Sequence, residues 1–216
     1  MTYLDIVNSV MIRLREREVS AVTENSYSKL IGQFVNEAKR QVEDAWNWNA
    51  LRKTLTAETQ SGVFNYELNT TGSRFRMLDV VNDTSNFFME NRSSAWFNNV
   101  FLNSDNVETG EPRYYNINGI SADGDTQVDI FPIPNNVYTL RFNVVDPQES
   151  LSDDSDTLLV PTEPVILGAY ARAVAERGED GGISSQEATF LAANSLSDHI
   201  ALDANRFGDE LIWREV

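Results

Sequence analysis

Residues 26–48 read SYSKLIGQFVNEAKRQVEDAWNW, and this stretch decides the fold. Its apolar residues recur at helical spacing and make one stripe: Tyr27, Leu30, Ile31, Phe34, Val35, Ala38, Val42 and Ala45. Because most polar residues lie off that stripe, we predict an amphipathic helix from about Ser26 to Trp46. At 1.5 Å per residue this helix is roughly 30 Å long, and it needs partners that cover its apolar side.

The N-terminal residues supply the first partner. Residues 2–17 read TYLDIVNSVMIRLRER, with Leu4, Val7, Val10, Met11 and Leu14 at helical spacing. Thr2 is placed to cap this helix, with Asp5 as its capping-box partner. We predict that the two helices form an antiparallel pair.

The pattern changes after Trp46. Residues 51–60 and 63–68 alternate apolar and polar side chains around Ser61-Gly62, which predicts a β-hairpin. Further candidate strands are 74–81, 86–90, 113–118, 126–132 and 137–145, separated by turn residues. Residues 93–99 fit either a helical turn or a loop.

The C-terminal part returns to helical spacing. Residues 146–157 (DPQESLSDDSDT) are acidic, and we expect a mobile linker there. A helix follows from Thr162 or Glu163, and its small residues from Gly168 to Ala175 allow a neighbouring helix to approach closely. Ser184 and Glu187 then match a capping box for a last helix that ends near Asn205.

These elements predict an α+β fold, a four-helix bundle from the N- and C-terminal helix pairs with a central β-rich insertion. The simplest way to cover the apolar faces of both helix pairs is to pack them against each other. The predicted divisions are the N-terminal helices over 1–48, the β-rich insertion over 49–146, an acidic linker over 147–161, the C-terminal helices over 162–207 and a tail over 208–216.

The charge balance limits the classes of function. Among 216 residues, 17 are Lys or Arg and 33 are Asp or Glu, a net charge of −16, and cysteine is absent. Disulfides, thiol catalysis and cysteine-ligated metals are therefore excluded. An acidic surface repels DNA phosphates and anionic lipid, so neither a conventional DNA-binding domain nor a membrane partner is expected. The first residues, MTYLDIVNSV, lack the order of a secretory signal, so we expect folding in the cytoplasm.

Motifs for catalysis or ligand binding are weak, and we predict no catalytic residue, cofactor or metal. His199 is the single histidine, and on a helix Ser195 shares its face while Asp198 points away, which argues against a catalytic relay. Counting from Asp154, Leu159 and Val165 stand where a calcium loop needs glycine and glutamate. A hydrolase that uses two carboxylates stays an open alternative, because a chain with this many acids always offers some pair.

Three apolar features are candidates for packing or contact. Trp46-Asn47-Trp48 ends the second helix, and we favour aromatic packing there, although Trp48 does not fit the stripe. An aromatic stretch either folds over a sheet or forms a contact surface: Phe87, Phe88, Trp96, Phe97 and Phe101. Near the C-terminus, Leu211, Ile212 and Trp213 need a place to be buried, either on their own bundle or in a partner.

The order of elements resembles a known family. An aromatic helix end (DAWNWN, 44–49) runs into a strand (LRKTLTAET, 51–59), and an alanine-rich helix (AYARAVAER, 169–177) follows the β region. Together these are similar to the head-to-tail adaptor proteins of tailed bacteriophages, and most like the podovirus type called tail tubular protein A. The resemblance covers nearly the whole chain by element order.

The resemblance implies a structural virion protein of the neck or tail, assembled in the host cytoplasm, rather than an enzyme. Such adaptors form a homo-oligomeric ring, commonly of twelve copies, beneath the portal protein. The C-terminal segment, here Leu211, Ile212 and Trp213, would dock on the portal, and the β-rich part would face the tail nozzle protein. DNA would pass through the lumen without specific binding, and an acidic lining suits this because phosphate binding depends on cations. Another phage tail or assembly protein is the alternative from the same class.

Overall fold

The computed structural model describes residues 1–68, 74–102, 107–178 and 184–206. The chain divides into two compact units. The helical unit contains Met1–Ala50 and Glu149–Val216, and the β unit contains Leu51–Gln148. The first fifty residues and the last part of the chain therefore share one unit, as the amphipathic faces of the two helix pairs predict.

Four helices of the helical unit have the expected positions: α1 (Tyr3–Arg13), α2 (Ser26–Ala45), α4 (Thr162–Arg177) and α5 (Ser185–Ala204). The α1, α2 and α4 helices pack against one another, and their contacts bury Ile6, Val10, Ile31, Val35 and Val165. This three-helix core joins the two ends of the sequence.

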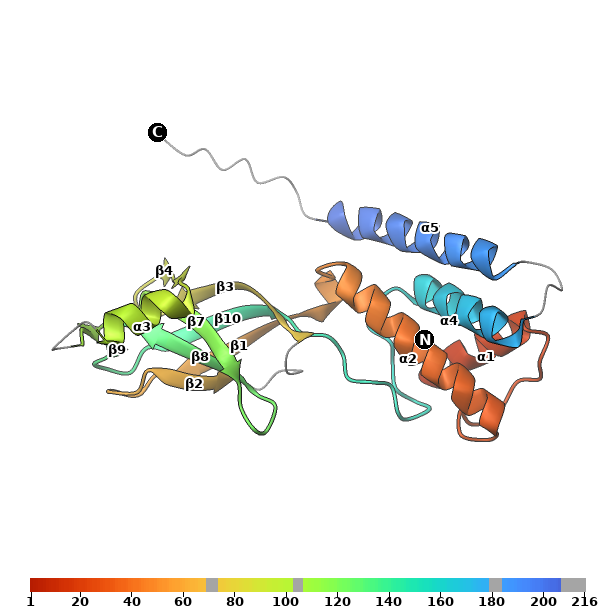
Figure 1. Ribbon diagram of the computed structural model, residues 1–216, viewed down its shortest axis with the longest axis horizontal. Helices are drawn as coiled ribbons and strands as arrows, with labels where there is room; N and C mark the ends of the chain where they lie inside the picture. Colours follow the sequence, from red (N-terminus) through yellow and green to blue (C-terminus); the bar gives the residue numbers. More distant parts are fainter. Residues whose placement is uncertain (69–73, 103–106, 179–183, 207–216) are drawn as a thin grey trace. The chain divides into compact units, whose positions relative to one another are not determined.

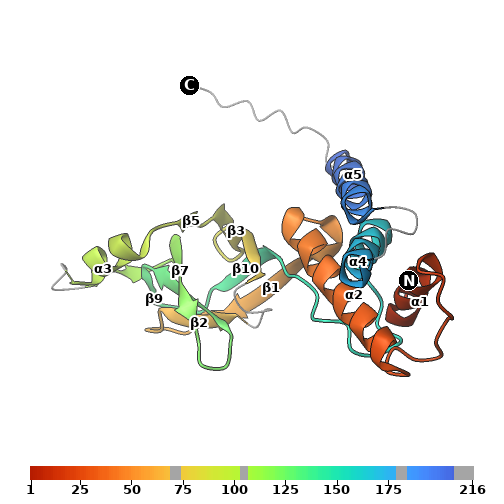
Figure 2. The same cartoon turned by 45° about the vertical axis from the view of Figure 1, so that its right-hand side comes forward.

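The predicted four-helix bundle is wrong, because α5 lies along α4 outside the three-helix core. In Figure 2, α4 lies between α5 and the pair formed by α1 and α2. The physical reason is that α5 buries little apolar surface: of its twenty residues, the fully buried ones are Ala188 and Asp203. A helix of this kind adds a side layer but cannot complete a bundle core.

Two close helix contacts depend on glycine. A Cβ built on Gly32 of α2 would lie 2.4 Å from the Tyr3 hydroxyl oxygen and 2.9 Å from a methyl carbon of Val22. A Cβ built on Gly168 of α4 would lie 3.1 Å from the Cβ of Ala38 in α2. The α2 and α4 backbones therefore approach as closely as their small residues allow.

Residues 149–160 are fixed to the N-terminal helices, which corrects the expectation of a mobile linker. The Tyr3 and Leu158 backbone amides donate to the carbonyls of Asp156 and Met1. The side chain of Asn36 both donates to and accepts from the backbone of Leu151, at 3.0 and 2.8 Å. Leu151, Leu158 and Val160 are buried, so the apolar residues of this acidic segment act as anchors.

The β unit is built from two four-stranded sheets. One has the order β1 (Arg52–Glu58), β10 (Thr139–Val145), β3 (Arg76–Asn82) and β4 (Phe87–Phe88). The other has the order β2 (Asn65–Leu68), β8 (Thr126–Phe131), β7 (Tyr114–Ile120) and β5 (Glu90–Asn91). Smaller elements complete the unit: a 3₁₀ turn, Asn49–Leu51, which begins in the helical unit, α3 (Ser94–Leu102), β6 (Thr109–Gly110) and β9 (Ile133–Pro134). Figure 1 shows the two sheets and α3.

The predicted hairpin of residues 51–60 and 63–68 is wrong, because its two strands belong to different sheets. Strand β1 pairs with β10 and strand β2 pairs with β8, both antiparallel. The turn between them exists, with Gly62 at a φ of 83°, but it leads from one sheet to the other. Side chains from both sheets, including Val80, Val128, Ile130 and Phe142, form one core.

We expect Gly32→Ala to destabilise the helical unit by about 1–3 kcal/mol, because the added methyl group overpacks the buried contact with Tyr3. Chemical denaturation followed by circular dichroism measures this loss. Gly119→Ala is the matched control, since no atom lies within 4 Å of a Cβ built at that position in β7. Equal stabilities of the two variants would contradict the overpacking.

We expect the charge of Asp156 to stabilise the protein at neutral pH and to stop doing so in acid. The backbone amides of Asp153 and Ser152 donate to its carboxylate, and these hydrogen bonds lower the pKa of Asp156. A carboxyl whose pKa is lower in the folded state adds stability above its unfolded pKa of about 3.9 and loses it as the pH falls.

Thermal unfolding at pH 7 and pH 3 tests this with Asp156→Asn. The variant should melt below the unmodified protein at pH 7, and the difference should shrink at pH 3. The lowered pKa values of Asp5 and Glu24 act equally in both proteins and cancel in the comparison. Asp153→Asn, which removes an exposed neighbouring charge, is the control; a difference that is constant with pH would rule out this role of Asp156.

Candidate functional site

The outer side of α5 exposes large apolar side chains. Phe190 and Leu202 each retain 65% of their accessible surface, and Leu191 retains 41%. Leu191 and Leu202 are separated by eleven residues, three helical turns, and so lie on one line of the helix surface. We call Phe190, Leu191 and Leu202 the α5 face; such a group of exposed apolar residues is typical of a contact surface.

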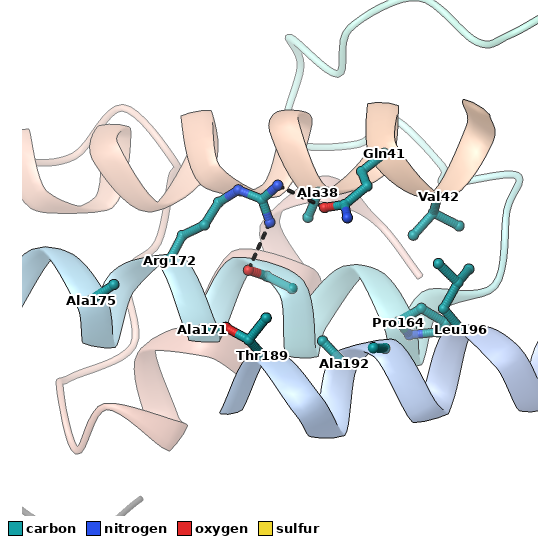
Figure 3. Close-up of a pocket in the computed structure, with 12 residues that line it drawn as sticks. Ala38, Gln41, Val42, Pro164, Ala171, Arg172, Ala175, Thr189, Ala192 and Leu196 are labelled. Atoms are coloured by element: carbon teal, nitrogen blue, oxygen red, sulfur yellow. Dashed lines mark hydrogen bonds between the residues drawn. The ribbon is translucent and has the colours of Figure 1, made fainter. Parts of the chain in front are cut away.

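A groove runs along the other side of α5, between α5, α4 and α2, and has a volume of about 430 Å³. Its walls are mostly small and apolar: Ala38, Gln41, Val42, Pro164, Gly168, Ala171, Arg172, Ala175, Thr189, Ala192, Ala193 and Leu196. Figure 3 shows residues of all three helices pointing toward this space. We call it the helical groove.

Arg172 forms the polar edge of the helical groove. Its guanidinium donates to the Gly168 carbonyl at 3.0 Å and to the Gln41 side-chain oxygen at 2.9 Å, both drawn in Figure 3. It also pairs with Glu37 at 3.3 Å. These contacts hold α4 to α2 beside the groove, and they leave the groove floor apolar.

Asp203 anchors the C-terminal end of α5. Its carboxylate accepts hydrogen bonds from the Trp46 indole N–H and from the Asn49 backbone N–H, each at 3.2 Å. Asp203 is 7% exposed, so these bonds are made away from water and are stronger than equivalent surface bonds. The end of α2 is thereby joined to the end of α5.

The Trp46-Asn47-Trp48 feature serves packing inside the helical unit. Trp48 is 1% exposed, and its indole N–H donates to the Val42 carbonyl at 2.6 Å. Trp46, which the helical stripe accommodated, is half-buried and faces Asp203. Sequence spacing did not assign Trp48 to a core, because its burial depends on the path of the chain after α2, which brings its indole back to the Val42 carbonyl.

The aromatic stretch of the β unit is largely folded onto a sheet. Phe97 is buried, and Trp96 and Phe101 of α3 are half-buried, with Trp96 5.0 Å from the Tyr114 ring centroid and Phe101 5.9 Å from that of Phe131. The guanidinium of Arg92 lies 5.1 Å from the Tyr114 ring centroid. Most of residues 93–99, for which the sequence allowed either a helical turn or a loop, therefore belong to α3.

Phe87 and Phe88 are the remaining members of that stretch. Phe87 is half-buried on β4 against the core, whereas Phe88 is 72% exposed. Of the aromatic candidates, Phe88 thus has the geometry of a contact residue. Leu211, Ile212 and Trp213 lie outside the described residues.

The described residues show little that suggests catalysis. Within the described ranges, no group of three or more His, Asp or Glu side chains is arranged to hold a metal ion. Hydrogen bonds to the charged form lower the pKa of the Asp5, Glu24 and Asp156 carboxyl groups. A general acid needs the opposite shift.

His199 is held to the backbone of its own helix. Its Nδ1 lies 2.8 Å from the Ser195 carbonyl oxygen, one turn earlier in α5, so this nitrogen is engaged with the helix backbone. Among the helices that the structure describes, none has both the length and the apolar content required to cross a bilayer.

Sequence reasoning missed the helical groove, the α5 face and the role of Asp203. The α5 face had a signal, since Phe190, Leu191 and Leu202 are large apolar residues in a helix whose other apolar residues are mostly alanines. Asp203 and the groove had none, because each depends on which helix packs beside α5.

We expect Asp203→Ala to loosen the C-terminal half of α5, because the indole and backbone N–H groups of Trp46 and Asn49 would lose their acceptor. Hydrogen bonds to a charged group contribute about 1.5–3 kcal/mol, so amide hydrogen exchange across residues 196–204 should rise by about tenfold or more. Asp198→Ala removes an exposed acid from the same helix and should leave exchange unchanged. Similar exchange in both variants would argue against the anchor.

A comparison with known protein families identifies the family of this chain. The model of the family described as SU10 adaptor protein matches residues 1–208. A comparison with individual curated proteins found no match.

Proposed function

The chain belongs to the SU10 adaptor protein family, and on this premise we propose that it forms the adaptor ring between the portal and the tail nozzle of a tailed phage. Its family makes it a structural head-to-tail adaptor of the virion. We further propose that the copies form a ring, that the ring binds the portal and the nozzle protein, and that it forms part of the DNA ejection channel.

The observation that carries the proposal is the α5 face on a chain of this family. A closed ring needs two different, complementary surfaces on each copy, because each copy contacts its neighbours head to tail. The exposed side chains of Phe190, Leu191 and Leu202 supply one apolar surface of this kind. Burial of a large apolar side chain contributes about 1.5–3 kcal/mol, so three of them favour association. Twelve copies is the number that the tail tubular protein A resemblance implies.

The C-terminal segment is the proposed contact with the portal. Leu211, Ile212 and Trp213 stand between Glu210 and Arg214, so they form a short apolar anchor on a polar tail. Tryptophan is favoured at the centres of interfaces because its burial excludes much water. In this arrangement Leu211, Ile212 and Trp213 would be buried in the portal protein.

The β unit is proposed to contact the nozzle protein. Phe88 on β4 and Val137 next to β10 are 72% and 60% exposed, which leaves apolar surface free for a partner. The shortness of β4, with two residues, limits unwanted pairing along this sheet edge.

The net charge of −16 suits a channel for DNA. Nucleic-acid affinity comes mainly from cations that displace counterions from phosphates. A ring whose copies are this acidic binds the passing DNA weakly, which favours movement over retention. Assembly in the host cytoplasm and a final place in the virion neck follow from the proposed role.

We expect truncation after Gly208 to weaken docking on portal rings by at least tenfold, since loss of a buried tryptophan anchor costs 2 kcal/mol or more at a typical hot spot, about thirtyfold in affinity. The truncated chain should keep the far-ultraviolet circular dichroism of the full chain. Negative-stain images of portal with full-length protein should show an added ring that shares the portal symmetry.

Phe88→Ser is the control for this experiment, because its exposed side chain belongs to the β unit and should not affect portal binding. Undiminished binding of the truncated chain would refute the docking role of the tail. A full-length protein that adds no ring to the portal would refute the adaptor position.

A further inference from the structure

The helical groove is an apolar hollow within a single copy of the chain. Its floor is made by alanines of α2, α4 and α5, and Leu196 closes the end toward the C-terminus of α5. Its volume of about 430 Å³ is large enough for one or two bulky side chains. Polar groups that converge on a small ligand are few, since Arg172 already bonds to Gln41 and to the Gly168 carbonyl. The groove therefore suits apolar side chains of a peptide.

The C-terminal segment of the same chain is one such peptide, because the groove lies within its reach from the end of α5. Leu196 and Ala192 precede Ala204 by 8 and 12 residues, about 12 and 18 Å along the helix. Leu211 follows Ala204 by 7 residues and Trp213 by 9, which reach up to about 23 and 30 Å when extended. A chain that reverses direction after α5 is long enough to bring Leu211, Ile212 and Trp213 over the groove.

The tail and the helical groove are also chemically complementary. The tail places three apolar side chains between Glu210 and Arg214. A second hollow adjoins the groove along α2, shares Gln41 and Arg172 with it, and has Glu37, Arg40 and Asp44 on its rim. The groove and the tail thus each have an apolar centre bordered by charges of both signs. Charged pairs can therefore form at the rim of the groove while the apolar residues of the tail are covered.

We propose that, in the unassembled protein, the Leu211-Ile212-Trp213 segment folds back along α5 and occupies the helical groove of its own chain. This proposal rests on the proposed adaptor function for its biological meaning: the anchor is stored on its own chain and is released when a portal offers a better site. Storage lowers self-association of free copies through this apolar segment, and it makes the tail available only where a competing surface is present.

The absence of cysteine makes a direct test available, because a single introduced thiol is the only one in the chain. Ala192→Cys places a thiol in the groove, and its reaction with a maleimide is measured in the full chain and in the chain truncated after Gly208. The full chain should react about tenfold more slowly if the tail covers the groove roughly nine-tenths of the time. Replacing Trp213 by Ala in the full chain should restore most of the fast reaction.

Ala201→Cys is the matched control, since Ala201 is exposed on α5 and lies about half a turn around the helix from Ala192. It should react equally fast in both chains. Ala193→Cys is a second groove position in case the first variant alters the helix. Equal rates at both groove positions with and without the tail would overturn the proposal.

A dilution series separates the tail of the same chain from the tail of a second copy. Protection that is unchanged from micromolar to nanomolar protein supports the intramolecular contact, and protection that fades on dilution overturns it in favour of an exchange between copies. The test contains no portal. A failure here therefore leaves the adaptor proposal standing, and a failure of portal docking leaves the groove proposal standing.

Discussion

The close packing of α2 against α4 is the contact on which the helical unit depends. Gly168 lets the α4 backbone approach Ala38 of α2, and this joins residues that are about 130 positions apart in the chain. The α1 helix packs on both, and the fixed segment after residue 149 is bonded to α1 and α2. That approach, together with the packing of α1 on α4, gives the two ends of the sequence a common core, and α4 in turn supplies the surface on which α5 lies.

The packing of α5 shows how a helix is held with little apolar burial. Alanines face α4 and α2 across the helical groove, and Asp203 fixes one end through two hydrogen bonds. The larger apolar side chains, Phe190 and Leu202, point away from this attachment and are exposed. The helix thus has one side for its own chain and another suited to a partner, which is the arrangement that an assembling protein needs.

The helices were predictable from the sequence to within a few residues because their signals are local. Apolar spacing located α1, α2 and α4, and the Thr2–Asp5 capping box marks the start of α1. The predicted four-helix bundle failed because spacing shows that a face is apolar, not which element covers it. The predicted hairpin failed for the same reason: alternation indicates a strand, while the partner of β1 is β10, more than eighty residues away.

Of the candidate site, sequence reasoning located the exposed Phe88 within an aromatic stretch but could not separate it from Phe97, since both are phenylalanines in one short segment. Burial separates them, and burial depends on α3 folding onto the sheet. Trp48 and Asp203 show the same limit, because their partners come from other parts of the fold.

The insertion of the β unit has a structural consequence of its own. The chain enters this unit through β1 and leaves it through β10, and these strands are direct neighbours, with Arg52 opposite Val145. Entry and exit points that lie side by side can be bridged by a short connection, so evolution can exchange the inserted module as a whole while the helices keep their own core. One helical body can in this way carry different inserted modules, and adaptors of this family can diversify by exchanging the whole insertion.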